Sequence, residues 1–323
     1  MKNKSIIINA NSNNFTSNAV RSLKEEGIVI IRGLFSKELL TEIDKNWKTN
    51  FKHPSVSGTI GYFRTSHAKA VLPLFLLGKP ALKITLEKKI ITIIEKVMKS
   101  KCTLAEANAV WHKATNYVYF PLHSDFATGW KKAKNSKFKL TSKDMNFPIG
   151  IGGMVYLHDT KSGAFKYSLK SHKLQSKYGQ HFASYPKNLK ESINKNIIIC
   201  KGIKGDLILF DDRGFHGPDQ PSKKDRSVLL FDYYRDNTFG SVIVTPHIIK
   251  ISDASILDKD QLRVLGINAS VMVPREEYVG TRYKKNIFYN FIVFLIEKSY
   301  FFIHIKLMIK YFIKKILLVI RFT

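Results

Sequence analysis

A histidine and an aspartate two positions apart, His123 and Asp125, stand in the segment 119–126 and could bind one metal ion together. We predict that this segment is an extended strand, in which side chains two positions apart project from the same face. An imidazole and a carboxylate are two of the three protein ligands in non-haem iron(II) oxygenases, which need one further histidine. His216 is the candidate for that ligand, because it follows the apolar strand predicted at 206–211 in a turn-rich stretch.

An arginine, Arg226, follows ten positions after His216 and opens the predicted strand 226–235. A guanidinium there has a chemical use, because its planar fork matches the distal carboxylate of 2-oxoglutarate. The near end of that acid chelates iron and leaves one position open for dioxygen. A lone His-x-Asp pattern occurs by chance in many chains of this length. The prediction therefore depends on the pair, the later histidine and the arginine occurring together.

With these residues the chain resembles the phytanoyl-CoA dioxygenase family of iron(II)- and 2-oxoglutarate-dependent oxygenases. The run 123–126 is similar to the corresponding run of ectoine hydroxylases, and the segments 27–40 and 156–173 resemble other parts of the family pattern. The resemblance covers roughly residues 15–240. It implies a double-stranded β-helix, a jelly roll of the cupin type, in which His123, Asp125 and His216 hold Fe(II). It also implies 2-oxoglutarate and O2 as co-substrates, and it leaves the substrate open.

The resemblance suggests a reaction and two further contacts. Asp125 stands where halogenating relatives carry a small residue, so the expected reaction is hydroxylation or a related oxidation that yields succinate and CO2. Lys113 and Phe120 are further candidates for binding 2-oxoglutarate, and core packing is the alternative interpretation of Phe120. A different class of function, a non-catalytic cupin-like membrane-associated binding protein with a vestigial metal site, is the alternative for the whole chain. The presence of all four residues argues against it.

The chain is strongly basic, because 53 Lys and Arg residues against 25 Asp and Glu residues give a formal net charge of +28. Nucleic acid, an anionic membrane surface or a lysine-rich coding bias could each explain this excess. The lysines are spread widely and no nucleic-acid motif is present, so we do not expect nucleic acid as a partner. Cys102 and Cys200 lack metal or disulfide spacing, and the apolar start is too short for a signal peptide. We therefore expect a reducing cytoplasm.

A lysine-rich insert, 127–147, follows the predicted metal-binding strand and contains six lysines and one acidic residue. Its position in the sequence places it at the mouth of the expected site. A solvated loop is one interpretation. The other is a lid that attracts an anionic substrate, either a small molecule or a lipid- or glycan-linked group.

The hydrophobic periodicity predicts an α-rich first third followed by a β core. Helices are expected at 16–26, 37–51 and 80–99, a strand at 27–35 and a loop at 52–79. Later strands are expected at 102–114, 116–124, 148–158, 163–169, 196–200, 206–211 and 226–235. Because no helical crossovers separate these strands, we expect an antiparallel arrangement. The predicted fold class is mainly β with α, in which N-terminal helices buttress the jelly roll.

We divide the chain into a dioxygenase domain at 1–245, a connector at 246–285 and a C-terminal tail at 286–323. The tail carries lysines at i, i+4 and i+8 opposite a largely apolar helical face. A basic amphipathic helix of this kind lies in the plane of a membrane interface. We therefore expect peripheral association with an anionic membrane surface on its cytoplasmic side. A core or dimer helix is the alternative interpretation of the tail.

Overall fold

The structure is a computed structural model of the chain. It describes residues 6–50, 69–112, 114–116, 118, 121–125, 146–174, 182, 185–236, 247, 249 and 251–266. Contacts divide the chain into two compact units, Met1–Met272 and Val273–Thr323, and every described residue belongs to the first. Lys113, Phe120 and the tail 286–323 lie outside the described residues, as does nearly all of the lysine-rich insert, so the predictions about them remain predictions. The proposed domain boundaries also remain predictions.

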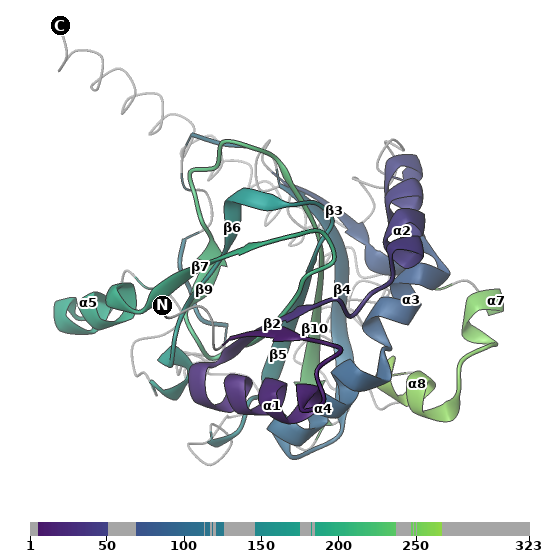
Figure 1. Cartoon of the computed structure of the whole chain (residues 1–323), viewed down its shortest axis with the longest axis horizontal. Coiled ribbons are helices and arrows are strands. Elements are labelled where there is room, and N and C mark those ends of the chain that lie inside the picture. The colour runs from purple at the N-terminus through teal and green to yellow at the C-terminus, as the bar shows by residue number, and fades with distance from the viewer. Residues whose placement is uncertain are drawn as a thin grey trace, which may run out of the picture. The chain divides into compact units, whose positions relative to one another are not determined.

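Two sheets make up the β core of the first unit (Figure 1). The larger has the strand order β1-β2-β8-β5-β10-β4-β3 and the smaller the order β7-β6-β9. The strands of the larger sheet are β1 (Ile7–Asn9), β2 (Ile28–Arg32), β3 (Lys69–Pro73), β4 (Cys102–His112), β5 (Gly150–Tyr156), β8 (Leu207–Asp211) and β10 (Arg226–Arg235). Those of the smaller are β6 (Thr160–Ser168), β7 (Ile197–Gly202) and β9 (His216–Pro218). Every pair except β1 with β2 is antiparallel, as the sequence predicted.

Two edge strands differ from the sequence-based expectation. β1 runs parallel to β2, and the helix α1 between them (Phe15–Glu26) supplies the crossover that a parallel pair requires. β3 lies within the segment 52–79, which we expected to be a loop. It pairs only with β4 and ends at Pro73, and an edge strand of this kind needs little hydrophobic alternation to form.

Helices cover the face of the larger sheet that points away from the smaller sheet (Figure 1). They are α1, α2 (Lys37–Asn50), α3 (Lys79–Thr85) and α4 (Lys88–Met98), while α5 (Lys187–Lys195) precedes β7. The predicted helix 80–99 is two helices, because the Glu87 side chain accepts a hydrogen bond from the Lys89 amide and starts α4 afresh. Among the described residues no helix is both long enough and apolar enough to cross a membrane.

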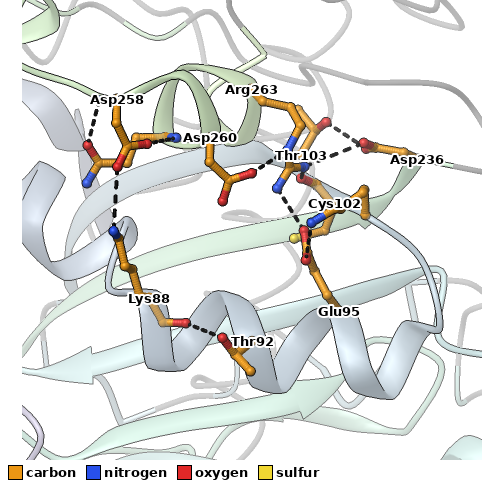
Figure 2. A network of polar contacts seen from close by, with 11 residues as sticks. Lys88, Thr92, Glu95, Cys102, Thr103, Asp236, Asp258, Asp260 and Arg263 are labelled. Carbon is orange, nitrogen blue, oxygen red and sulfur yellow. Dashed lines mark hydrogen bonds and ion pairs between the residues drawn. The ribbon is translucent and has the colours of Figure 1, made fainter.

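The short helices α7 (Ile251–Ala254) and α8 (Lys259–Val264) belong to the predicted connector, and Figure 2 shows the polar network that attaches α8 to α4 and β4. Arg263 donates hydrogen bonds to Glu95 at 2.8 Å and to the Cys102 carbonyl at 3.0 Å. Asp258 caps α8 by accepting a hydrogen bond from the Gln261 amide. This part of the connector therefore packs on the β core.

Strand β10 lies inside the larger sheet, between β4 and β5, and its two faces contribute to two different hydrophobic clusters. Side chains alternate between the two faces of a strand. Leu229, Phe231 and Tyr233 belong to the hydrophobic cluster beneath the helices. The alternate residues face the smaller sheet, and they are Arg226, Val228, Leu230, Asp232 and Tyr234. Polar groups therefore stand at both ends of the inner face of this strand.

Candidate metal centre

The structure brings His123, Asp125 and His216 to one point, where each offers a ligand atom within 4.8 Å of the other two. Asp125 lies between the imidazoles, with Oδ1 3.4 Å from His123 Nε2 and Oδ2 3.3 Å from His216 Nε2. The two imidazole centroids are 4.5 Å apart. No other group of three such residues converges in this way in the part of the chain that the structure describes. Two imidazoles and one carboxylate form a donor set suited to iron(II).

Backbone hydrogen bonds fix the two chain segments that carry these ligands. His123 and His216 exchange amide-to-carbonyl bonds of 3.0 and 2.8 Å, and the Asp125 amide donates to the Asp212 carbonyl at 3.0 Å. The predicted strand 116–124 was wrong in its extent. Its described residues form an isolated bridge at His123, and Pro121 has no amide hydrogen to continue a ladder. Both ligands of the His-x-Asp pair nevertheless face the same site.

Each imidazole is oriented by a carbonyl two residues before it. His123 Nδ1 lies 3.0 Å from the Pro121 carbonyl oxygen, and His216 Nδ1 lies 2.9 Å from the Gly214 carbonyl oxygen. A carbonyl oxygen only accepts hydrogen bonds, so both Nδ1 atoms carry the hydrogen. In the neutral ring Nε2 then carries the lone pair, and this atom faces Asp125. This is the usual arrangement of metal-binding histidines.

The turn between β8 and β9 is held by a buried ion pair between Asp211 and Arg213. Arg213 donates from Nε and Nη2 to the two Asp211 oxygens at 2.9 and 2.6 Å, and its amide donates to Oδ1 at 3.0 Å. The side chains are only 1% and 9% exposed. Ser124 Oγ donates to the Arg213 carbonyl at 2.8 Å, which joins the turn to the His-x-Asp segment. The serine between the two ligands thus points away from the metal position and anchors the loop.

The Asp125 carboxylate is the more open side of the triad, since its side chain is 42% exposed while those of His123 and His216 are 14% and 7% exposed. Burial by surrounding atoms favours the neutral carboxyl group. When the two imidazoles are protonated, the charge of His216 and the Nε2–H hydrogen bonds from both rings outweigh burial and lower the pKa of Asp125. The carboxylate is therefore ionised at neutral pH and could ligate a divalent cation.

Three more carboxyl groups lie on the inner side of the core beside the triad, and we call them the acidic wall: Glu106, Asp212 and Asp232. Glu106 of β4 stands directly opposite Asp232 of β10. Burial and the charges of Asp232 and Asp125 raise the pKa of Asp212. Burial and the charges of Glu106 and Asp125 do the same for Asp232. Burial and the charges of all four carboxyl groups likewise raise the pKa of Tyr234, so its phenol lies among them.

Arg226 is buried, with 3% of its surface exposed, at the opposite end of the inner face of β10. Burial raises the pKa of Tyr156 and the charge of Arg226 opposes this, which places the guanidinium near the phenol. Tyr156 Oη in turn accepts a hydrogen bond from the Phe165 amide at 2.9 Å, and the Phe165 ring stacks on His216 with centroids 5.8 Å apart. Tyr156 and Phe165 thus connect the predicted carboxylate-binding arginine to the metal triad.

The acidic wall was absent from the sequence-based prediction, although a signal for it existed. Arg226 and Asp232 are six positions apart in a predicted strand, and residues separated by an even number share a face. That spacing alone places Asp232 on the same side as the arginine. Glu106 and Asp212 could not be added in this way, because their proximity depends on which strands pair.

No family model matches the chain, and no curated protein matches it in sequence. The resemblance to the phytanoyl-CoA dioxygenase family therefore remains a prediction. Solved structures that are similar include EctD from S. alaskensis with 2-oxoglutarate and 5-hydroxyectoine, at 14% identity and a TM-score of 0.57, covering 76% of this chain and 86% of EctD. EctD with bound Fe is similar at 13% identity and a TM-score of 0.56, covering 74% and 84%.

The epimerase SnoN, in complex with Fe3+, alpha ketoglutarate and nogalamycin RO, is similar at 14% identity and a TM-score of 0.51. The alignment covers 70% of this chain and 86% of SnoN. Likeness at such low identity concerns the fold. Together with the two sheets and their helical cover, it confirms the predicted β-rich, cupin-like jelly roll with helices on one side.

Proposed function

We propose that the chain is an iron(II)- and 2-oxoglutarate-dependent dioxygenase that hydroxylates a small-molecule or a lipid- or glycan-linked substrate. The observation that carries this proposal is the convergence of His123, Asp125 and His216 inside a jelly roll. The similar folds of EctD and SnoN, whose structures hold iron and 2-oxoglutarate, support it.

The residues present fit iron(II) in their donor chemistry. Both histidines have Nδ1 fixed by a carbonyl and Nε2 directed toward Asp125, whose carboxylate is ionised. His123, Asp125 and His216 would therefore hold the ion and leave other positions for exogenous ligands. When bound, iron(II) with 2-oxoglutarate and O2 supplies the oxidising chemistry of this class of enzyme, with succinate and CO2 as by-products.

The role of this chain's own residues is to bind and orient. Arg226 would bind the distal carboxylate of 2-oxoglutarate through its bidentate fork. Phe165 and Tyr156 lie between Arg226 and His216, so they would form the apolar side of the 2-oxoglutarate site and exclude water from it. Lys113 and Phe120 remain further candidates for contacts with this acid.

Arg226→Lys tests the 2-oxoglutarate assignment. Lysine keeps the charge but loses the fork, so the apparent KM for 2-oxoglutarate should rise by a factor of about 10 to 100, which corresponds to a loss of roughly 1.5–3 kcal/mol. Succinate formation at varied 2-oxoglutarate concentration measures this. An unchanged KM would mean that another residue binds the distal carboxylate, and Lys113 is the first candidate. Metal binding without any succinate formation would instead favour the non-catalytic binding protein.

We also propose that the tail 286–323 holds the enzyme on the cytoplasmic face of a membrane, close to a membrane-proximal substrate. The support is its basic, amphipathic sequence, in which each basic residue near an anionic leaflet contributes on the order of 1 kcal/mol. The full chain should sediment with anionic vesicles more than with neutral ones, and salt should release only part of it. A chain that ends near Tyr283 should remain in the supernatant. If the shortened chain unfolds instead, and the full chain does not bind vesicles, the tail is a core or dimer helix.

The expected negative charge of the substrate rests on the lysines of the insert 127–147, nearly all of which lie outside the described residues. The described interior beside the triad carries the acidic wall instead. The proposed function therefore does not include the sign of the substrate charge.

A further inference from the structure

We infer that the substrate carries a cationic nitrogen group, such as a protonated amine, an amidinium or a guanidinium, which binds to the acidic wall beside the metal triad. This inference rests on the proposed function and adds the charge of the substrate. It reverses the sign that the lysine-rich insert suggested.

Glu106 and Asp232 form the part of the acidic wall that lies on two paired strands. They are direct cross-strand neighbours on β4 and β10, and both are only half-buried. Carboxyl groups that face each other across a sheet repel when both are ionised, so a bound cation would stabilise their ionised forms. Asn108, also on β4, donates a hydrogen bond of 2.6 Å to Glu106 Oε1 and thereby orients one carboxylate oxygen. Beside Asp232 on β5 stands Gly152, and the Phe210 ring lies where a Gly152 side chain would project.

Asp212 is the most deeply buried member of the acidic wall. Its side chain is 1% exposed, and its Oδ1 atom is buried without a hydrogen-bond partner among the described residues. The Asp125 amide donates to the Asp212 carbonyl at 3.0 Å, and the Asp212 carboxyl group accepts a backbone hydrogen bond from Gly152, the cross-strand neighbour of Asp232. Asp212 therefore lies between the triad and Asp232. A buried acceptor with no donor is rare and destabilising. An N–H group of a bound cation would satisfy it.

The spacing of the wall favours an organic cation over a second metal ion. In the part of the chain that is described, only the His-Asp-His triad gathers three ligand atoms within 4.8 Å. Glu106, Asp212 and Asp232 form no such group among the described residues. An ammonium or guanidinium group spreads its donors over a larger volume and can bond several separated oxygens.

The charges along β10 also indicate the direction of binding. Arg226 stands at one end of the inner face and Asp232 six residues farther on, roughly 20 Å at 3.4 Å per residue. The basic end suits the carboxylate of 2-oxoglutarate, and the acidic end suits a cation. The metal triad adjoins both, because His216 contacts Phe165 on the Arg226 side and Asp125 interacts with Asp232.

The test measures binding to protein loaded with iron(II) and 2-oxoglutarate without oxygen. The probes are pairs that differ in one charge: L-arginine with L-citrulline, agmatine with N-carbamoylputrescine, and L-lysine with L-norleucine. L-Glutamate serves as the anionic probe. Calorimetry should show that at least one cation binds about tenfold or more tightly than its neutral partner, and the same cation should accelerate succinate formation when oxygen is admitted.

Asp232→Asn and Glu106→Gln should each reduce that preference by a factor of about 10 to 100 while retaining a folded protein, since both side chains keep their size. Glu191→Gln removes one exposed charge from α5 and should leave the preference unchanged. The inference is overturned if no cation binds, or if the neutral or anionic probes bind as tightly. Binding of iron(II) and 2-oxoglutarate is measured first, without probes. If the protein binds neither, the proposed function fails and the inference fails with it. If it binds both but shows no preference for a cation, only the inference fails.

Discussion

Replacing Asp211 by asparagine would show how strongly the turn between β8 and β9 supports the metal centre. Asp211 and Arg213 are 1% and 9% exposed and make two side-chain contacts of 2.9 and 2.6 Å. Asn keeps the size of the side chain and removes the negative charge that compensates the buried guanidinium. Breaking a buried ion pair from one side costs about 3–5 kcal/mol. For a unit of this size, that lowers the Tm by roughly 6–20 °C, at about 2–4 °C per kcal/mol.

Loss of the Asp211–Arg213 ion pair should also affect the candidate metal ligands. The Arg213 carbonyl accepts a hydrogen bond from Ser124, and the Gly214 carbonyl orients His216. A loosened turn should therefore weaken iron(II) affinity about 10- to 100-fold, as is typical when groups that orient metal ligands are removed. Thermal unfolding of the metal-free protein and anaerobic equilibrium dialysis with iron(II) measure the two effects separately.

Lys88→Gln is the matched control for Asp211→Asn. It breaks the exposed Lys88–Asp258 pair, whose charged atoms are 3.6 Å apart and whose side chains are 83% and 49% exposed. Such a pair contributes less than about 1 kcal/mol. If Asp211→Asn unfolds at the wild-type temperature and binds iron(II) normally, the buried pair does not support the site and the reasoning is refuted.

Two further predictions concern Gly214 and His172. A Cβ at Gly214 would lie 1.9 Å from the Tyr167 hydroxyl oxygen. Gly214→Ala should therefore destabilise the protein by about 1–3 kcal/mol and weaken iron(II) binding. Denaturation and dialysis curves identical to those of the wild type would contradict this prediction. Burial lowers the pKa of His172, so the unfolded state takes up the proton more readily. The free energy of unfolding should therefore fall as the pH drops below about 6.5. Urea titrations at several pH values should show a smaller fall in His172→Gln, and an identical fall would assign the effect to other groups.

The side-chain chemistry of the site was readable from the sequence because it depends on residue type and short spacing. His123 with Asp125, and His216 after an apolar strand, are local patterns, and the structure brings all three together. Most core strands were also predicted, since β10 and β8 have strong β-forming composition. Edge strand β3 carries a weaker signal because a single partner, β4, holds it in place.

What the sequence could not predict depends on pairing between distant segments. Glu106 and Asp232 are 126 positions apart and become neighbours only because β4 pairs with β10 in one particular register. The break between α3 and α4 is likewise decided by packing and by the capping side chain of Glu87, which a continuous apolar pattern conceals. The charge of the interior beside the candidate metal site thus depends on topology, whereas the three candidate metal ligands were predicted from residue type and spacing.

Iron(II) binding by the wild-type chain and by Asp125→Ala, measured by anaerobic dialysis together with succinate formation, tests the central claim most directly. Asp125 supplies one of three ligands and the only negative charge among them. The wild type should bind one iron(II) per chain at micromolar concentration and convert 2-oxoglutarate to succinate. Asp125→Ala should lose both properties while remaining folded. Retention of iron(II) binding and full turnover by this variant would contradict the assignment of the triad.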